Sequence, residues 1–67
     1  MKKYTIKELE EQTGDKIEDV MTDYIESCKR TGHYDFWDNI NYFMKENELK
    51  DSEHDRVEEL LMTLWVK

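Results

Sequence analysis

The 67-residue chain contains no proline and no alanine, and it has only two glycines and one cysteine. Without proline, no expected helix carries an internal breaker, and both glycines, Gly14 and Gly32, stand where expected helices end. Because alanine is absent, a core has to be built from large side chains, among them four methionines and eight aromatic residues. These absences favour a few short, uninterrupted helices with tight connections.

The single cysteine and the lack of long apolar runs narrow the class of protein. Cys28 has no partner for an internal disulfide, and its place on an apolar stripe indicates a small buried side chain. No run approaches the roughly 18 apolar residues of a membrane span, and the opening MKKYTIKELEE lacks the apolar core of a signal peptide. We therefore expect a cytoplasmic protein, in a bacterium or in a phage-infected host cell, and a single small helical domain over residues 1–67.

Capping signals and helical periodicity predict four helices. Thr5 and Glu8 have the T-x-x-E spacing of a capping box, which predicts a first helix over 6–13. A 3.6-residue periodicity then predicts a second helix over 16–31, Asp35 caps a third over 36–48, and Asp51 or Ser52 caps a fourth over 53–66. The only strand candidate, KYTI, has no expected partner. The predicted fold is all-α, a small orthogonal bundle of three to four short helices.

The apolar positions of these helices predict one thin core. On the third helix, Phe36, Trp37, Ile40, Phe43 and Met44 share a face, and Tyr42 points elsewhere. On the fourth helix, Met62 and Val66 fall outside the apolar stripe. The residues expected to meet in the shared core are Ile17, Val20, Tyr24, Ile40, Phe43, Leu60, Leu61 and Leu64.

Negative charge is concentrated in the first half of the chain. The formal charge is −7, and residues 8 to 26 hold eight carboxylates and one lysine. Such a field repels nucleic acid and anionic membranes and attracts basic protein surfaces, although a solvated helix surface is the simpler interpretation. If this charge forms a binding surface, two aromatic residues outside the apolar stripes, Tyr34 and Tyr42, would flank it. The acidic residues of that surface would be Glu11, Asp15, Glu18, Asp19, Asp23 and Glu26.

The segment YTIKELEEQTG, residues 4–14, resembles the opening of the helix-turn-helix in MerR-type regulators, where a capped helix and a glycine turn precede a recognition helix. The resemblance implies DNA binding through the second helix. Two departures argue against that function. Glu10 stands where the family usually has a small residue, and the second helix offers Asp19 and Asp23 where a recognition helix needs hydrogen-bond donors for phosphates and bases.

Neither a metal site nor a catalytic site has a clear signature. Cys28, His33 and His54, with Asp35 or Asp55, include the ligand types that metals prefer, but Cys28-x4-His33 is one loose pair and the others have no recognised spacing. No serine or cysteine has a general base at a sequence spacing that is typical of a catalytic pair. Carboxylates on a solvated helix also lack the enclosed pocket that general acid-base catalysis needs. We therefore expect no enzyme, no metal and no cofactor.

These features of the sequence favour one functional hypothesis and leave two alternatives. The hypothesis is a small non-enzymatic protein that binds and blocks a basic, nucleic-acid-binding site on a partner protein. The size and composition of the chain are similar to those of phage-encoded inhibitors of host machinery, such as anti-CRISPR and DNA-mimic proteins. The first alternative is a helical regulatory or assembly subunit that forms a homodimer through Met62, Val66 and Tyr42. The second is an accessory domain whose acids bind no partner.

Overall fold

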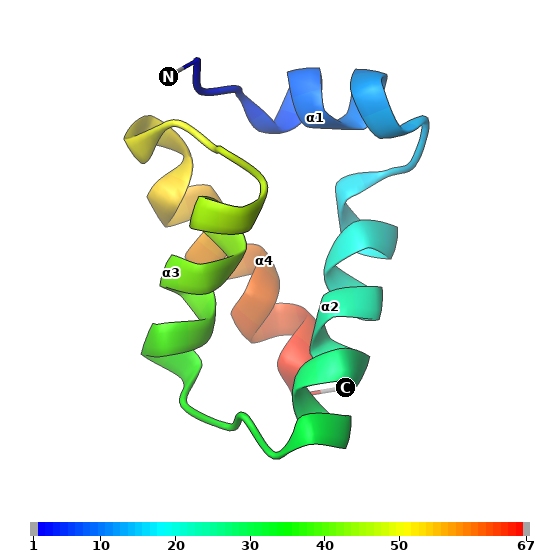
Figure 1. The fold of residues 1–67 in the computed structure, drawn as a ribbon, viewed down its shortest axis with the longest axis vertical. Coiled ribbons are helices and arrows are strands. Elements are labelled where there is room, and N and C mark those ends of the chain that lie inside the picture. Colours follow the sequence, from blue (N-terminus) through cyan, green and yellow to red (C-terminus); the bar gives the residue numbers. More distant parts are fainter. Residues whose placement is uncertain (1, 67) are drawn as a thin grey trace.

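A computed structural model describes residues 2–66 and shows four α-helices in that range. In chain order the elements are α1 (Ile6–Thr13), α2 (Ile17–Thr31), α3 (Phe36–Glu46), the 3-10 helix η1 (Asp51–Glu53) and α4 (His54–Trp65). Figure 1 shows α1 lying across one end of the molecule, with α2, α3 and α4 forming the body below it. The prediction of a small all-α orthogonal bundle is confirmed.

The two ends of α1 follow the signals in the sequence. The Thr5 hydroxyl oxygen accepts a hydrogen bond from the Glu8 amide at 3.2 Å, and the Glu8 carboxylate accepts one from the Thr5 amide at 2.9 Å. Gly14 ends the helix at φ +75°, a left-handed conformation that a side chain would strain. Gly32 ends α2 in the same way at φ +80°.

The start of α2 is held by a residue of α1. Lys16 occupies the N-cap position and makes no side-chain capping bond, and Asp15 lies in the turn before the helix. Instead, the Glu10 carboxylate accepts a hydrogen bond of 2.7 Å from the Ile17 amide. This bond satisfies one of the free amides at the helix start and fixes the corner between α1 and α2.

One core joins all four helices, and it contains the residues predicted from the second, third and fourth helices. Ile17, Ile40, Phe43 and Leu61 are buried, while the half-buried Val20, Tyr24, Leu60 and Leu64 pack against the same cluster. The rings of Tyr24 and Phe43 meet edge to face, with centroids 5.2 Å apart. Further buried members of the cluster are Ile6, Leu9, Met21, Ile25, Met44, Leu49 and Val57.

The segment after α3 differs from the prediction. The expected helix to residue 48 ends at Glu46, because the chain turns through Glu48 at φ +51° and buries the Leu49 side chain. Tyr4 then pairs with this segment: its amide donates to the Glu48 carbonyl at 2.7 Å, and its carbonyl accepts from the Lys50 amide at 2.8 Å. The expectation that the KYTI segment has no pairing partner was therefore wrong, and a single bridge joins Tyr4 and Leu49.

The fourth helix is shorter than predicted at both ends. It begins at His54 after the turn of η1, and no side chain caps it, so the caps expected from Asp51 and Ser52 are not formed. It ends at Trp65, with Val66 just beyond the last turn. Within residues 2–66, none of the helices is long and apolar enough to cross a membrane.

Trp37 is not a core residue, contrary to the prediction. Its side chain is 60% exposed, and its ring meets the half-buried Phe36 ring edge to face at 5.6 Å. It lies in the first turn of α3, at the end of the molecule where α4 also ends (Figure 1).

Candidate functional site

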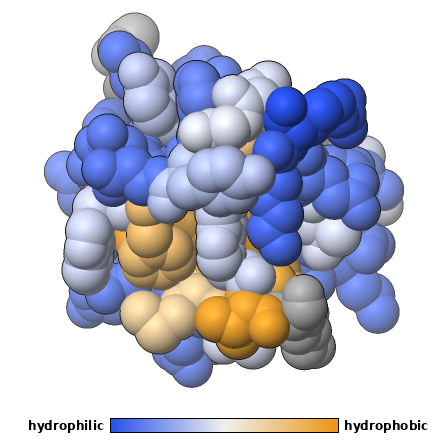
Figure 2. Space-filling view, turned by 90° about the horizontal axis from the view of Figure 1, so that it is seen from below, coloured by the Kyte–Doolittle hydropathy of each residue, from blue (hydrophilic) through white to orange (hydrophobic). Residues whose placement is uncertain are grey.

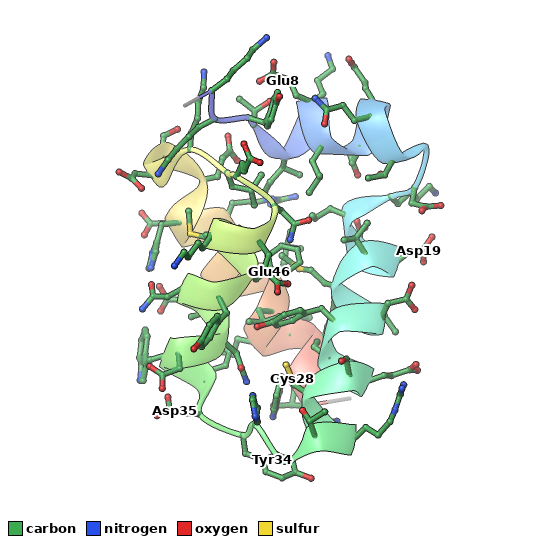
Figure 3. All side chains as sticks on the ribbon, in the orientation of Figure 1. Glu8, Asp19, Cys28, Tyr34, Asp35 and Glu46 are labelled. Carbon is green, nitrogen blue, oxygen red and sulfur yellow. The ribbon has the colours of Figure 1, made fainter. Side chains whose placement is uncertain are left out.

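The acidic set of α2 lies opposite the side of the helix that enters the core. Ile17, Met21, Ile25 and Cys28 are buried, and they fall within about 80° of one another at 100° per residue. On the same scale Asp19, Asp23 and Glu26 fall on the other side of the helix, and all three are exposed. Figure 3 shows Asp19 on the outer side of α2, directed away from the rest of the bundle. We call these three residues the acidic stripe.

The remaining members of the predicted set surround the stripe unevenly. Asp15 lies in the turn at the N-terminal end of α2, and Glu18 lies on the helix about 100° from Asp19. Glu11 is exposed on α1, which runs across the end of the bundle, so it belongs to a different side of the corner (Figure 1). The structure thus places Glu18 and the acidic stripe on one helix, with Asp15 in the turn before it and Glu11 at its margin. We call all six residues the acidic surface.

Two of the eight acids between residues 8 and 26 serve the fold. Glu8 completes the capping box of α1, and Glu10 caps α2. Hydrogen bonds from the Thr5 amide and then its hydroxyl lower the pKa of Glu8, with Lys50 and Lys2 adding to the effect. The T-x-x-E spacing predicted the role of Glu8 but not that of Glu10, because a side chain that reaches across a turn to another helix leaves little trace in local spacing.

The other six acids have no such structural partner. Within residues 2–66, the ion pairs involve Lys3 with Asp51 and His54 with Asp55 and Glu58, and none includes a residue of the acidic surface. All six side chains are exposed. On the outer side of α2 the sign of the charge changes at Arg30, four residues after Glu26, and Lys29 is exposed beside it. The acidic surface is therefore confined to the N-terminal three turns of the helix and the corner before it.

The two tyrosines predicted to flank the acidic surface lie elsewhere. Tyr34 is 62% exposed in the loop after α2, at the opposite end of that helix from Asp15, and its hydroxyl donates to the Lys29 carbonyl at 3.1 Å (Figure 3). Tyr42 is exposed on α3 and lines a groove of about 320 Å³ between α2 and α3. The structure therefore does not gather Tyr34 and Tyr42 around the acidic stripe, although both are exposed as expected.

The groove between α2 and α3 is closed underneath by a hydrogen-bonded tyrosine. Tyr24 donates from its hydroxyl to the Asn39 carbonyl at 3.1 Å, and the buried Asn39 amide donates to the His33 carbonyl at 2.8 Å. Burial first, and a hydrogen bond with the buried Cys28 second, raise the pKa of Tyr24 far above its usual value. Tyr24 therefore stays protonated and donates the hydrogen bond that connects α2 to α3. We interpret the groove as part of this helix packing and not as a binding site.

The residues with metal-ligand chemistry are divided between two places. Cys28 and His33 line the groove beside α2, whereas His54 lies at the start of α4. His54 is close to Asp55 and Glu58, with 3.9 Å from its Nδ1 to a carboxylate oxygen of each. These are exposed or half-buried side chains on one helix turn, and such pairs also form without any ion.

The corner formed by α1 and α2 has the outline of a helix-turn-helix, with a three-residue turn through Gly14. Its second helix presents carboxylates to solvent, as the sequence indicated, and so lacks the donors of a recognition helix. No known family model, curated protein or solved structure matches the chain. The evidence for its function therefore lies in its own exposed surfaces, the acidic surface above all.

Proposed function

We propose that this protein is a non-enzymatic binding protein, and that its acidic surface occupies and blocks a basic, nucleic-acid-binding site on a partner protein. The observation that carries the proposal is that six exposed carboxylates on and beside α2 have neither a capping role nor an ion-pair partner among residues 2–66. A rigid row of unpaired carboxylates is complementary to a row of lysine and arginine side chains.

The density of charge along α2 supports a site that normally holds nucleic acid. From Asp15 to Glu26 there are five carboxylates and Lys16, a net charge of −4 over twelve residues, or eleven steps along the chain. At 1.5 Å per residue this is about 16 Å of helix, or one net negative charge in about 4 Å. A single nucleic-acid strand carries one charge in about 3.4 Å. A groove that binds a strand would therefore meet a similar linear charge density on this helix.

The size and acidity of the chain point to a class of inhibitor. They are similar to those of the small proteins that phages and mobile elements make against host machinery, anti-CRISPR and nucleic-acid-mimic proteins among them. We infer the same class for this protein, with a cytoplasmic site of action in a bacterium or an infected host cell. The partner is then a host protein whose own function is to bind DNA or RNA.

A charge-reversal experiment tests the proposal against the simpler role of a solvated helix surface. The immobilised protein is exposed to a bacterial lysate, and captured proteins are eluted with a salt gradient. We expect a basic nucleic-acid-binding protein that elutes as salt screens the contact, since the Debye length falls from about 8 Å at physiological ionic strength to about 3 Å at 1 M. The test variant replaces Asp19, Asp23 and Glu26 by lysine, and it should lose the captured protein.

A matched control separates this contact from a general effect of net charge. Replacing the exposed Asp51, Asp55 and Glu59 by lysine also changes the formal charge from −7 to −1, because each replacement adds two charges. This control should keep the captured protein. In addition, duplex DNA or single-stranded RNA should displace the captured protein. If both triple variants behave alike, or if nucleic acid and this protein bind the captured protein together, the proposal is wrong.

A further inference from the structure

A second exposed surface lies at the end of the molecule opposite α1. Three large apolar side chains are exposed there, Trp37 at 60%, Met62 at 49% and Val66 at 80%, and the half-buried Phe36 and Trp65 lie next to them in sequence. Figure 2 looks at this end of the molecule and shows apolar side chains gathered on it. We call these five residues the apolar end patch.

The composition of the apolar end patch is that of an interface centre. It contains two tryptophans, a phenylalanine and a methionine, which are residue types enriched in the buried centre of protein interfaces. The residues come from the start of α3 and the end of α4, two helices that pack on each other through the core. The patch therefore rests on a fixed part of the fold.

The edges of the apolar end patch carry opposite charges. On the α3 side, the exposed Asp35 and Asp38 bracket Phe36 and Trp37 in the chain. On the α2 side, the Lys29 ammonium lies 5.6 Å from the centre of the Trp65 ring, and the exposed Arg30 follows it. The patch thus has an acidic edge and a basic edge, although the chain as a whole has a charge of −7.

We propose that the apolar end patch binds a second copy of this chain in a symmetric dimer. In a two-fold interface each side presents the same patch, so a suitable axis places the acidic edge of one copy on the basic edge of the other. Two chains of charge −7 repel each other through the rest of their surfaces. The C-terminal end of α2 differs, because the exposed residues of this helix change there from carboxylates to Lys29 and Arg30. The proposed seam differs from the expected one of Met62, Val66 and Tyr42, because Tyr42 lines the groove between α2 and α3 and Trp37 stands in its place.

This dimer is independent of the proposed inhibitory function. Figure 3 shows Asp19 directed outward from α2, far from the end of that helix where Lys29 lies, so the dimer leaves this part of the acidic stripe uncovered in both copies. Each dimer would then present two acidic surfaces to solvent. Loss of the dimer therefore need not remove binding by a single copy, and loss of binding in the Asp19, Asp23 and Glu26 triple variant need not remove the dimer.

The molar mass of the purified protein, measured by sedimentation equilibrium from micromolar to millimolar concentration, tests the proposal directly. We expect a monomer-dimer equilibrium. Val66→Asp and, separately, Met62→Asp should each weaken dimerisation by about tenfold or more, because each buries an unpaired charge in the seam. Both residues are exposed in the single chain, so the variants should fold normally by circular dichroism. The matched control, Tyr42→Asp, also replaces an exposed large side chain and should dimerise like the wild type.

Charge exchange tests the orientation of the two copies. Asp38→Arg and Lys29→Asp should each weaken the dimer, since each puts like charges on facing edges. The double variant reverses both edges and should regain the dimer. A protein that stays monomeric at millimolar concentration, or a dimer that Val66→Asp leaves intact, overturns the proposal. A double variant no better than the single variants would overturn the paired-edge geometry.

Discussion

The inner and outer sides of α2 belong to one continuous helix but relate to the rest of the molecule in opposite ways. The inner side buries Ile17, Met21, Ile25 and Cys28 against the other helices. The outer side carries the acidic stripe, whose carboxylates neither cap a helix nor form an ion pair within residues 2–66. The inner residues are therefore required for stability, whereas the outer residues have no role in the fold. Free carboxylates in this number are the reason to assign the outer side to a partner.

The largest effect on stability should come from the inner side. Met21→Ala removes a fully buried side chain from the centre of the core, and it should lower the free energy of unfolding by about 2–5 kcal/mol. Chemical denaturation measures this loss. The matched control is Thr22→Ala, one residue along on an exposed position, where the change should stay within about 0.5 kcal/mol. Equal losses in the two variants would remove the contrast between the two sides.

A smaller effect should distinguish the structural acids from the free ones. Glu10→Ala removes the acceptor of the Ile17 amide and should cost about 1 kcal/mol, as loss of an N-terminal cap does. Glu10→Gln keeps a carbonyl oxygen in place and should recover most of that stability. Glu11→Ala, at the next and exposed position, serves as the control and should be nearly neutral. Thermal unfolding of the three variants compares them, and a costly Glu11→Ala would show that Glu11 also serves the fold.

The capping box should make part of the stability depend on pH. Hydrogen bonds from Thr5 lower the pKa of Glu8 from its usual 4.5, so the folded state binds this proton less tightly than the unfolded state. The stabilisation is then complete above pH 4.5 and is lost as the pH falls through the lower value of the folded state. Glu8→Gln removes this contribution, so the stability difference between wild type and variant should shrink in acid. Unfolding curves measured from neutral pH down to acid check this, and a constant difference would contradict it.

The smallest effect on stability should come from the outer side itself. Replacing Asp23 and Glu26 by lysine should change the free energy of unfolding by no more than about 0.5 kcal/mol, because both positions are exposed and lysine is a good helix former. Circular dichroism and denaturation measure helix content and stability together. A large loss would mean that the acidic stripe holds the fold in some way, and it would weaken the proposal that the stripe serves a partner.

The elements that the sequence predicted well are those encoded by local signals. The capping box, the two glycine stops and the apolar periodicity of α2 each involve residues within a few positions of one another, and the structure follows all of them. The exposure of the acidic surface was predicted for the same reason, since side chains opposite an apolar stripe face solvent. The sequence also predicted that Glu8 serves the fold, whereas the capping role of Glu10 is seen only in the structure.

The features that the sequence did not reveal depend on residues far apart in the chain. Leu49 is one of the most buried side chains, yet it follows a turn with no periodicity to mark it. Trp37 has the spacing of a core residue, yet it packs only against the half-buried Phe36 ring and stays 60% exposed, which depends on how α3 is placed in the bundle. The separation of Tyr34 and Tyr42 likewise follows from how α3 is placed against α2, which their spacing in the sequence does not specify.

The bridge between Tyr4 and the segment after α3 also has a consequence for how the molecule opens. It joins residues 44 or more positions apart, so it forms only after α3 is in place, whereas the turns of each helix form locally. α1 contributes only Ile6 and Leu9 to the core, so its release should be the least costly partial unfolding of the molecule. Amide hydrogens of α1 should therefore exchange faster than those around Met21 in α2. When α1 detaches, Glu10 leaves the Ile17 amide with it, and the first turn of α2, which carries Glu18 and Asp19, loses its anchor at the same moment.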